Sequence, residues 1–159
     1  MLPFKYIYLR SLCALFIGLI AMTSGLAQTI PPIGSTLTAS DMETAKTKTQ
    51  IQDGKSVLWV LSTGRSSSGP LTMLVNEQGV VGRSANEVII ANSPIEQTKL
   101  RIASYLSKTV SVDYVDNMKI TVLRFSAIAD AAKAVAELRT AMPDARITLP
   151  VVYSIPRPR

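Results

Sequence analysis

Few side chains in this sequence can carry out chemistry, because it contains no histidine and one cysteine, Cys13. A Ser/His/Asp triad and a Cys/His pair both use a histidine as the general base. A Ser–Lys pair needs a desolvated lysine, and no lysine here lies within an apolar run. The acidic residues are scattered singly, so no carboxylate pair stands out, although a pair formed in space stays open. We therefore expect a non-enzymatic protein without catalytic residues, cofactor-binding residues or metal ligands.

Two glycine-containing stretches have part of the spacing of a phosphate-binding loop. In DGKS, residues 53–56, the pattern requires a glycine five residues before Gly54, and that position is Thr49. In GRSSSGP, residues 64–70, no lysine follows Gly69. We interpret the first stretch as a surface turn and the second as a flexible loop that proteases can reach.

Residues 1–27 have the three parts of a secretory signal. Lys5 and Arg10 give the start a positive charge, and the apolar run LCALFIGLIAM follows. This run is too short for a good membrane span, and small residues at its end predict cleavage after Ala27. An uncleaved membrane anchor is the alternative. The protein is therefore expected to be exported to the periplasm or the cell exterior.

The mature chain, residues 28–159, lacks cysteine and must fold without disulfides, which one domain of this size can do. Removing Lys5 and Arg10 leaves 15 basic and 11 acidic residues. Outside the cytoplasm this excess favours an acidic protein surface or an envelope polyanion as partner, and no nucleic acid is expected. A solvated basic surface without a partner explains the charge equally well.

A polar leader opens the mature chain. Residues 28–55 are rich in serine and threonine and are expected to be mostly disordered and flexible. The capping-box pattern of SDME, residues 40–43, predicts a short helix over 41–50.

A β-rich extension is expected next, over residues 56–85. NEQG, residues 76–79, has the composition of a hairpin turn. The stretch 62–70 is expected to be a loop, between strands predicted at 57–61, 71–75 and 80–82.

Residues 86–155 predict the order strand, helix, strand, strand, helix, strand. Alternating or short apolar runs indicate the four strands, at 86–92, 109–115, 119–125 and 147–155. Ser93 and Pro94 favour the start of the first helix, whose core-facing residues are expected to be Ile95, Ile102, Ala103 and Leu106. The second helix, 127–142, has apolar residues at helical spacing and is followed by Pro143; these residues are Ile128, Ala131, Ala132, Val135, Leu138 and Met142.

This order predicts an α+β fold of the ferredoxin-like type, a βαββαβ sandwich with a four-stranded antiparallel sheet and both helices on one face. Pro150 cannot donate a ladder hydrogen bond, so its strand is expected at an edge of the sheet. In the ferredoxin-like order the last strand is an edge strand.

Several single residues receive an interpretation from their positions. Trp59 and Tyr153 are expected in the core, as large aromatic residues in strands. For Arg124, a solvated strand end is favoured over an interaction residue. Thr148 and Val152 are expected on the sheet face away from the helices as a contact surface, where a charge at Val152 weakens partner binding without unfolding the domain.

The stretch from NEVII through SPIEQTKLRIASYL, VSVDYVDNMKITVLRF and the alanine-rich helix to the final strand resembles the propeptide domain of subtilisin-like serine proteases. The likeness covers about 70 of the 132 mature residues, 86–158. It implies a ferredoxin-like sandwich that lays its sheet against the protease and acts as a folding chaperone and inhibitor.

The resemblance also implies a role for the C-terminal tail, residues 156–159, which follows the last strand. Carried over to this sequence, the protease-binding residues that occupy the substrate cleft are Ser154, Ile155, Pro156, Arg157, Pro158 and Arg159, with Arg159 nearest the catalytic serine. No protease domain follows Arg159, so the chain is expected to act in trans. The alternative is a non-catalytic periplasmic or secreted protein-interaction module of the same fold.

Overall fold

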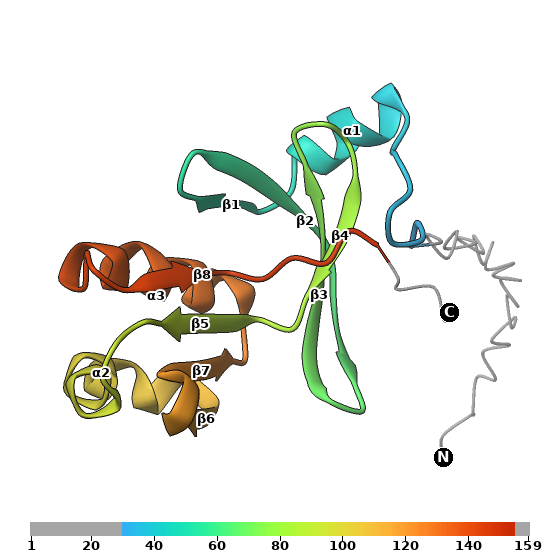
Figure 1. Cartoon of the computed structure of the whole chain (residues 1–159). Helices are drawn as coiled ribbons and strands as arrows, with labels where there is room; N and C mark the ends of the chain where they lie inside the picture. The colour runs from blue at the N-terminus through green and yellow to red at the C-terminus, as the bar shows by residue number, and fades with distance from the viewer. Residues whose placement is uncertain (1–29, 155–159) are drawn as a thin grey trace, which may run out of the picture.

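The computed structural model describes residues 30–154, and this part of the chain has an α+β fold with three α-helices and two antiparallel four-stranded sheets (Figure 1). The first sheet has the order β1-β2-β3-β4. Its strands follow one another in the chain as hairpins, β1 (Gln50–Asp53), β2 (Ser56–Ser66), β3 (Gly69–Asn76) and β4 (Val81–Ser84).

Two of the predicted turns connect strands of this sheet. The DGKS stretch is the turn between β1 and β2, where Asp53 pairs with Ser56 and Gly54 has φ +63°. Asn76 forms the turn between β3 and β4: its carbonyl accepts from Gly79 N at 2.9 Å, and its side-chain oxygen accepts from Val80 N at 2.9 Å. Both turns are confirmed.

The predicted loop over 62–70 is wrong, because most of it belongs to a long hairpin. β2 and β3 stay paired from Ser62 with Met73 to Ser66 with Gly69, after a bulge between Val60 and Ser62. Serine and threonine resemble loop residues in composition, but the partner strand satisfies their backbone groups, and pairing across the hairpin is not visible in local sequence.

The predicted disorder of the leader does not fit residues 39–53, which form α1 (Ala39–Lys46) and β1. Thr38, not Ser40, caps the helix by accepting from Asp41 N at 3.2 Å. Ala45 is buried, and Leu37 N donates to Gly79 O at 2.9 Å. These contacts with the first sheet order the segment.

The second sheet has the order β6-β7-β5-β8 with every neighbouring pair antiparallel. Its strands and helices alternate along the chain as β5 (Glu87–Ala91), α2 (Ile95–Ile102), a 3₁₀ helix η1 (Ala103–Lys108), β6 (Thr109–Val115), a 3₁₀ turn η2 (Asp116–Met118), β7 (Ile120–Phe125), α3 (Ile128–Ala141) and β8 (Arg146–Thr148). The predicted element order over this part of the chain is confirmed up to β8.

The two helices differ in how well the sequence predicted them. All six residues expected on the inner face of α3 are buried. In the first helix Ile102 is buried, but Ala103 is exposed and Leu106 is 47% exposed, because the α-helix ends at Ile102 and tightens to a 3₁₀ helix. Ser93 does not cap α2; its hydroxyl accepts from Thr98 Oγ1 at 3.0 Å.

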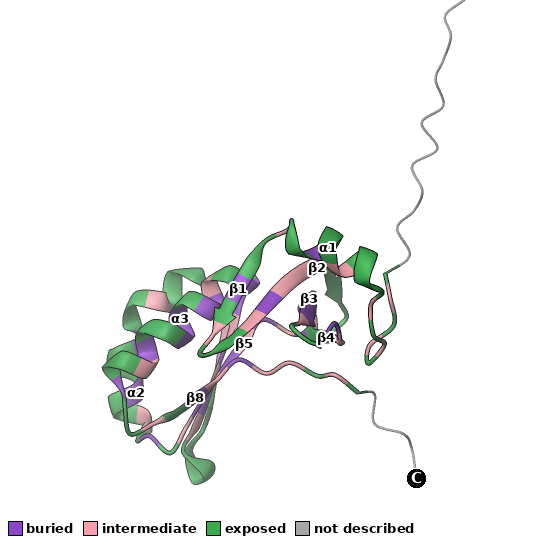
Figure 2. Cartoon of the chain, turned by 90° about the horizontal axis from the view of Figure 1, so that it is seen from above, coloured by how far each residue is buried: buried purple, intermediate pink, exposed green. Residues whose placement is uncertain are grey.

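One apolar core joins the two sheets. α3 packs against β5, β7 and β8 and also against β1 of the first sheet. Arg139 on α3 strengthens this contact, since it donates to Ile147 O at 3.0 Å and pairs with Asp53 at 2.8 Å. Figure 2 shows α2 and α3 on the same side of the second sheet. The buried side chains of the sheet therefore face α3, while the alternate side chains lie on the opposite face.

Asn86 fixes the junction between β4 and β5, where the chain passes from the first sheet to the second. It has a left-handed backbone with φ +56°. Its side chain is 2% exposed, accepts from Thr72 Oγ1 at 2.7 Å and donates to Ser126 O at 3.4 Å. These bonds link β3 to the start of α3, so the two sheets are held by polar contacts as well as by the core.

The predicted last strand over 147–155 is wrong, because β8 ends at Thr148. β8 is an edge strand as expected, but Pro150 lies beyond its end, where the chain crosses to β4 (Figure 1). Trp59 and Tyr153 are half-buried instead of lying in the core.

Candidate binding surfaces

The structure separates the two residues predicted to share a contact surface. Thr148 on β8 is half-buried and pairs with Ile89 of the second sheet. Val152 is 41% exposed and forms a bridge with Arg83 of the first sheet. The expected place of Val152 on the face of the second sheet is therefore corrected, because β8 ends at Thr148, four residues before Val152.

Of the predicted tail, Ser154 is exposed and is the last residue that the structure describes. Ile155, Pro156, Arg157, Pro158 and Arg159 lie outside the described residues. The structure therefore fixes where the tail begins, beside β4, and leaves its binding role a prediction.

The second sheet presents a partly apolar face away from α2 and α3. Ile89 pairs with Val122 on one side and with Thr148 on the other. Neighbours in register point to the same face, so these three residues share it with Asp113, and the next row holds Ala91, Ile120, Val115 and Arg146. The apolar side chains and Thr148 are half-buried, except for Val115 at 36% exposed, whereas Asp113 and Arg146 are exposed. A partly apolar face of this kind, with one acidic and one basic side chain on it, can pack against another protein.

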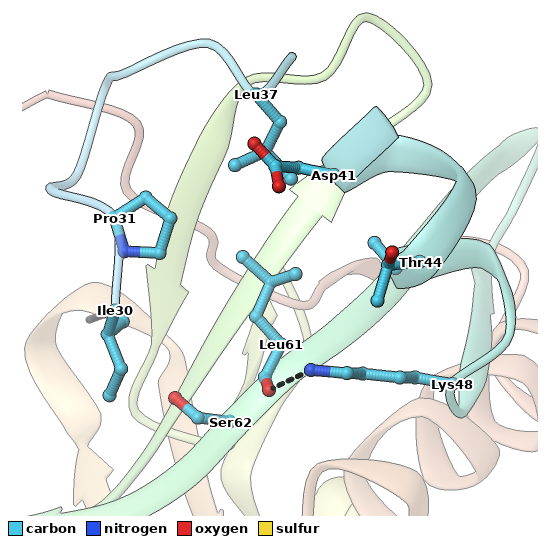
Figure 3. A pocket seen from close by; sticks show the side chains of 9 residues that line it. Ile30, Pro31, Leu37, Asp41, Thr44, Lys48, Leu61 and Ser62 are labelled. Carbon is cyan, nitrogen blue, oxygen red and sulfur yellow. Dashed lines mark hydrogen bonds between the residues drawn. The ribbon is translucent and has the colours of Figure 1, made fainter. Parts of the chain in front are cut away.

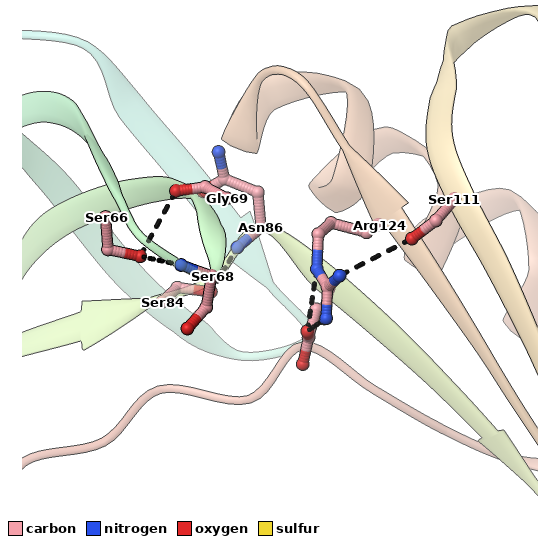
Figure 4. Close-up of polar contacts among 8 residues, drawn as sticks. Ser66, Ser68, Gly69, Ser84, Asn86, Ser111 and Arg124 are labelled. Carbon is pink, nitrogen blue, oxygen red and sulfur yellow. Dashed lines mark hydrogen bonds and ion pairs between the residues drawn. The ribbon is translucent and has the colours of Figure 1, made fainter.

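An ion pair marks one end of this face (Figure 4). Arg124 on β7 and Glu87 on β5 are paired in register, and Arg124 Nε donates to Glu87 Oε1 at 3.0 Å. The side chains are 27% and 22% exposed. Arg124 also approaches Ser111 Oγ on β6 at 3.5 Å, so it is neither the solvated strand end expected for it nor a free interaction residue.

The tip of the β2–β3 hairpin lies against this ion pair. A Cβ built at Gly69 would be 3.4 Å from Arg124 Cδ, which is ordinary van der Waals contact. The tip itself is closed by Ser66, whose hydroxyl donates to Gly69 O at 3.3 Å. Sequence reasoning missed Glu87 as a partner, although opposite charges at matching positions of two strands were an available signal.

Exposed apolar side chains are also frequent in residues 100–118, the part of the chain that contains the edge strand β6. Among the described residues, six of the eight exposed large hydrophobic side chains lie between positions 100 and 118; they are Leu100, Leu106, Val110, Tyr114, Val115 and Met118. β6 is the edge strand opposite β8. An unpaired edge with apolar side chains is a site where another chain can add a strand.

Lys99 on α2 lies above Tyr114 on this edge. Its ammonium group is 5.4 Å from the centre of the Tyr114 ring, within the range of a cation–π contact. Glu96, which accepts from Lys99 Nζ at 2.7 Å, raises the pKa of the lysine. The edge strand therefore carries an exposed aromatic ring beneath a lysine that is itself paired with Glu96.

A pocket of about 400 Å³ lies between α1, β2 and the start of the described chain (Figure 3). Pro31, Leu37 and Leu61 give it an apolar lining. Its two charged residues are already engaged: Asp41 accepts from Thr38 Oγ1 at 2.7 Å, and Lys48 donates to Leu61 O at 3.2 Å. The pocket thus lacks a set of free polar groups that converge on a ligand.

Comparisons with family models, with curated proteins and with solved structures gave no match to this chain. Within residues 30–154, no three His, Cys, Asp or Glu side chains are grouped as metal ligands. In the same range, no helix has the length and apolar character needed to cross a membrane.

Proposed function

We propose that residues 86–154 form a ferredoxin-like βαββαβ unit and that the exported protein binds a subtilisin-like serine protease in trans, as an inhibitor or folding chaperone. The observation that carries this proposal is the combination of chain order and sheet order. The elements run β5, α2, β6, β7, α3, β8, and the sheet order is β6-β7-β5-β8 with antiparallel neighbours. The ferredoxin-like unit is built from two split β-α-β pieces of this kind.

The face around Ile89 and Val122 supports a role in binding. It lies opposite the helices, carries apolar side chains, and ends at the Glu87–Arg124 ion pair. We propose that this face packs on the protease. Burying apolar area contributes roughly 25 cal/mol per Å², and the ion pair at its end gives the contact a fixed polar position.

The tail supplies the second half of the proposed contact. Five residues follow Ser154, and an extended segment of that length spans at most about 17 Å. Pro156 and Pro158 limit the conformations of the free tail, which lowers the entropy lost when it docks as an added strand. Ser154 to Arg159 then occupy the substrate cleft, with Arg159 nearest the catalytic serine.

The test is a titration of residues 28–159 against an exported subtilisin-like protease from the same source, followed by peptide hydrolysis. A chain truncated after Ser154 is compared with it, and a full-length variant with Arg157→Ala and Arg159→Ala separates charge from length. Inhibition by the full chain that is weakened by truncation supports the proposal. A folded full-length chain that leaves hydrolysis unchanged at micromolar concentration refutes inhibition, and a refolding assay of the same protease then tests the chaperone role.

The β6 edge favours a second candidate, a non-catalytic interaction module that pairs an extended segment of another exported protein with β6. The exposed side chains of Val110 and Tyr114 carry this candidate, at 55% and 39% exposed. Val110→Glu discriminates between the two functions: it blocks strand addition at β6 but leaves protease inhibition through the opposite face and the tail intact. Loss of inhibition by folded Val110→Glu would favour the edge as the binding surface.

A further inference from the structure

The outer edge of β4 holds segments from both ends of the described chain. Arg83 and Val152 exchange two backbone hydrogen bonds, Arg83 N to Val152 O at 2.9 Å and Val152 N to Arg83 O at 2.8 Å. Residues 34–37 pair with the preceding part of the same edge, where Gly34 N donates to Val81 O at 2.8 Å. The start and the end of the described chain therefore meet side by side on one strand.

Two positions in this meeting point accept no side chain. A Cβ at Gly82 would lie 2.7 Å from Val151 Cγ1 and 2.8 Å from the Tyr153 ring. A Cβ at Gly34 would lie 2.7 Å from the carbonyl oxygen of Tyr153, and Gly34 also has φ +82°. Glycine is thus required at both positions, on β4 and on the leader, for Tyr153 to lie where it does.

Tyr153 is the residue that both glycines admit, Gly82 beside its ring and Gly34 beside its carbonyl oxygen. It is half-buried, and its burial, together with the nearby charge of Asp53, raises the pKa of its phenol. Leu149, 4% exposed, and the partly buried Val151 hold the preceding chain on the shared core. Residues 149–153 are therefore fixed along their whole length, although β8 has already ended.

We propose that the first sheet and the leader serve to hold the C-terminal segment, with Gly34, Gly82 and Tyr153 as positioning residues for the tail. This inference rests on the proposed function and assigns a task to residues 30–84 within it. Holding the chain at Tyr153 lets residues 155–159 start from one point, and their reach is limited to about 17 Å from Ser154. A tail that starts from a fixed point loses less entropy on docking than one released at Thr148.

The first test measures native-state amide exchange of Val152 and Arg83 in the full mature chain. Gly82→Ala is compared with Gly64→Ala, because Gly64 is also in a strand of the first sheet but a Cβ there meets nothing within 4 Å. Gly34→Ala is compared with Gly54→Ala, since both glycines have positive φ, and at Gly54 the nearest atom is the end of the flexible Arg139 side chain at 3.5 Å.

The expected result is exchange of the Val152 amide that is faster by about tenfold or more in Gly82→Ala and Gly34→Ala, with unchanged exchange in β5 and β7. The matched controls keep the protection of the wild-type chain. Tyr153→Ala gives the same release by removing the ring instead of adding atoms, which covers the case in which a glycine variant fails to fold. Wild-type protection of Val152 in all three variants would overturn the inference.

The second test measures the inhibition constant for the same protease with the same variants. Weaker inhibition by Gly82→Ala and Tyr153→Ala, approaching that of the chain truncated after Ser154, supports the positioning role. If Val152 is released but inhibition stays at the wild-type level, the holding contact exists but does not position the tail, and the inference is wrong. If the wild-type chain does not inhibit at all, the proposed function fails, and the exchange data still report on the contact at β4.

Discussion

Replacing Arg124 by alanine tests whether the ion pair at the end of the apolar sheet face is a structural part of it. The substitution removes the cation from Glu87, which is 22% exposed and keeps its carboxylate charge. Breaking an exposed ion pair costs about 0–1 kcal/mol, and breaking a fully buried one costs about 3–5 kcal/mol. The burial of this pair lies between these limits, so we expect a loss of about 2 kcal/mol in the free energy of unfolding.

The control is Lys46→Ala, which breaks an exposed pair with Glu43 at 47% and 74% exposure. Its expected cost is about 0.2–0.5 kcal/mol. Urea unfolding at neutral pH measures both variants, and an unchanged slope with a lower midpoint identifies a true loss of stability. The double variant Arg124→Ala/Glu87→Ala regains part of the loss, because it no longer leaves a carboxylate without its partner. A cost for Arg124→Ala no larger than that of Lys46→Ala would refute this reasoning.

Three further predictions concern the core, the pH dependence and the proposed contact. Leu138→Ala on α3, at a side chain 1% exposed, lowers the free energy of unfolding by about 2–5 kcal/mol, while Leu100→Ala, at 81% exposed, changes it by less than about 0.5 kcal/mol, both measured by urea unfolding. Burial and the hydrogen bond to Glu137 raise the pKa of Tyr105 to about 12 from 10.0, so the free energy of unfolding falls as pH rises from 10 to 12. The difference in phenolate absorbance between the native chain and Tyr105→Phe gives the titration of Tyr105 alone, and a midpoint near 10 would contradict this prediction. Thr148→Lys weakens protease binding without lowering the unfolding midpoint, and equal binding by Thr148→Lys and by Thr140→Lys on the exposed face of α3 would exclude Thr148 from the contact.

The sequence correctly predicted those helices and strands that are defined by the spacing of apolar residues close together in the chain. α3 was predicted from six apolar residues at helical spacing, and all six are buried because a single helix face carries them. β6 and β7 were predicted from short apolar runs separated by Asp116 and Asn117, where the chain does turn.

Features that depend on pairing between distant residues were not predicted. Residues 62–66 resemble a loop until β3 supplies their hydrogen bonds. Val151 and Tyr153 continue the apolar alternation of β8 in the sequence, yet Val152 between them pairs with Arg83, 69 positions earlier in the chain. The exposed Leu106 fits a helix pattern, but the backbone tightens at Ala103 and turns that side chain outward. Alternation alone could not show that the chain changes sheets after Thr148.

The most direct test of the central claim asks whether the tail occupies the active site of the protease. A fluorophosphonate probe that reacts with the catalytic serine is added to the subtilisin-like protease, alone and with an excess of residues 28–159. The account predicts that the full chain blocks labelling and that the chain truncated after Ser154 blocks it far less. Equal labelling in the presence of a full-length chain that is bound to the protease would contradict the account, because the tail would then lie outside the cleft.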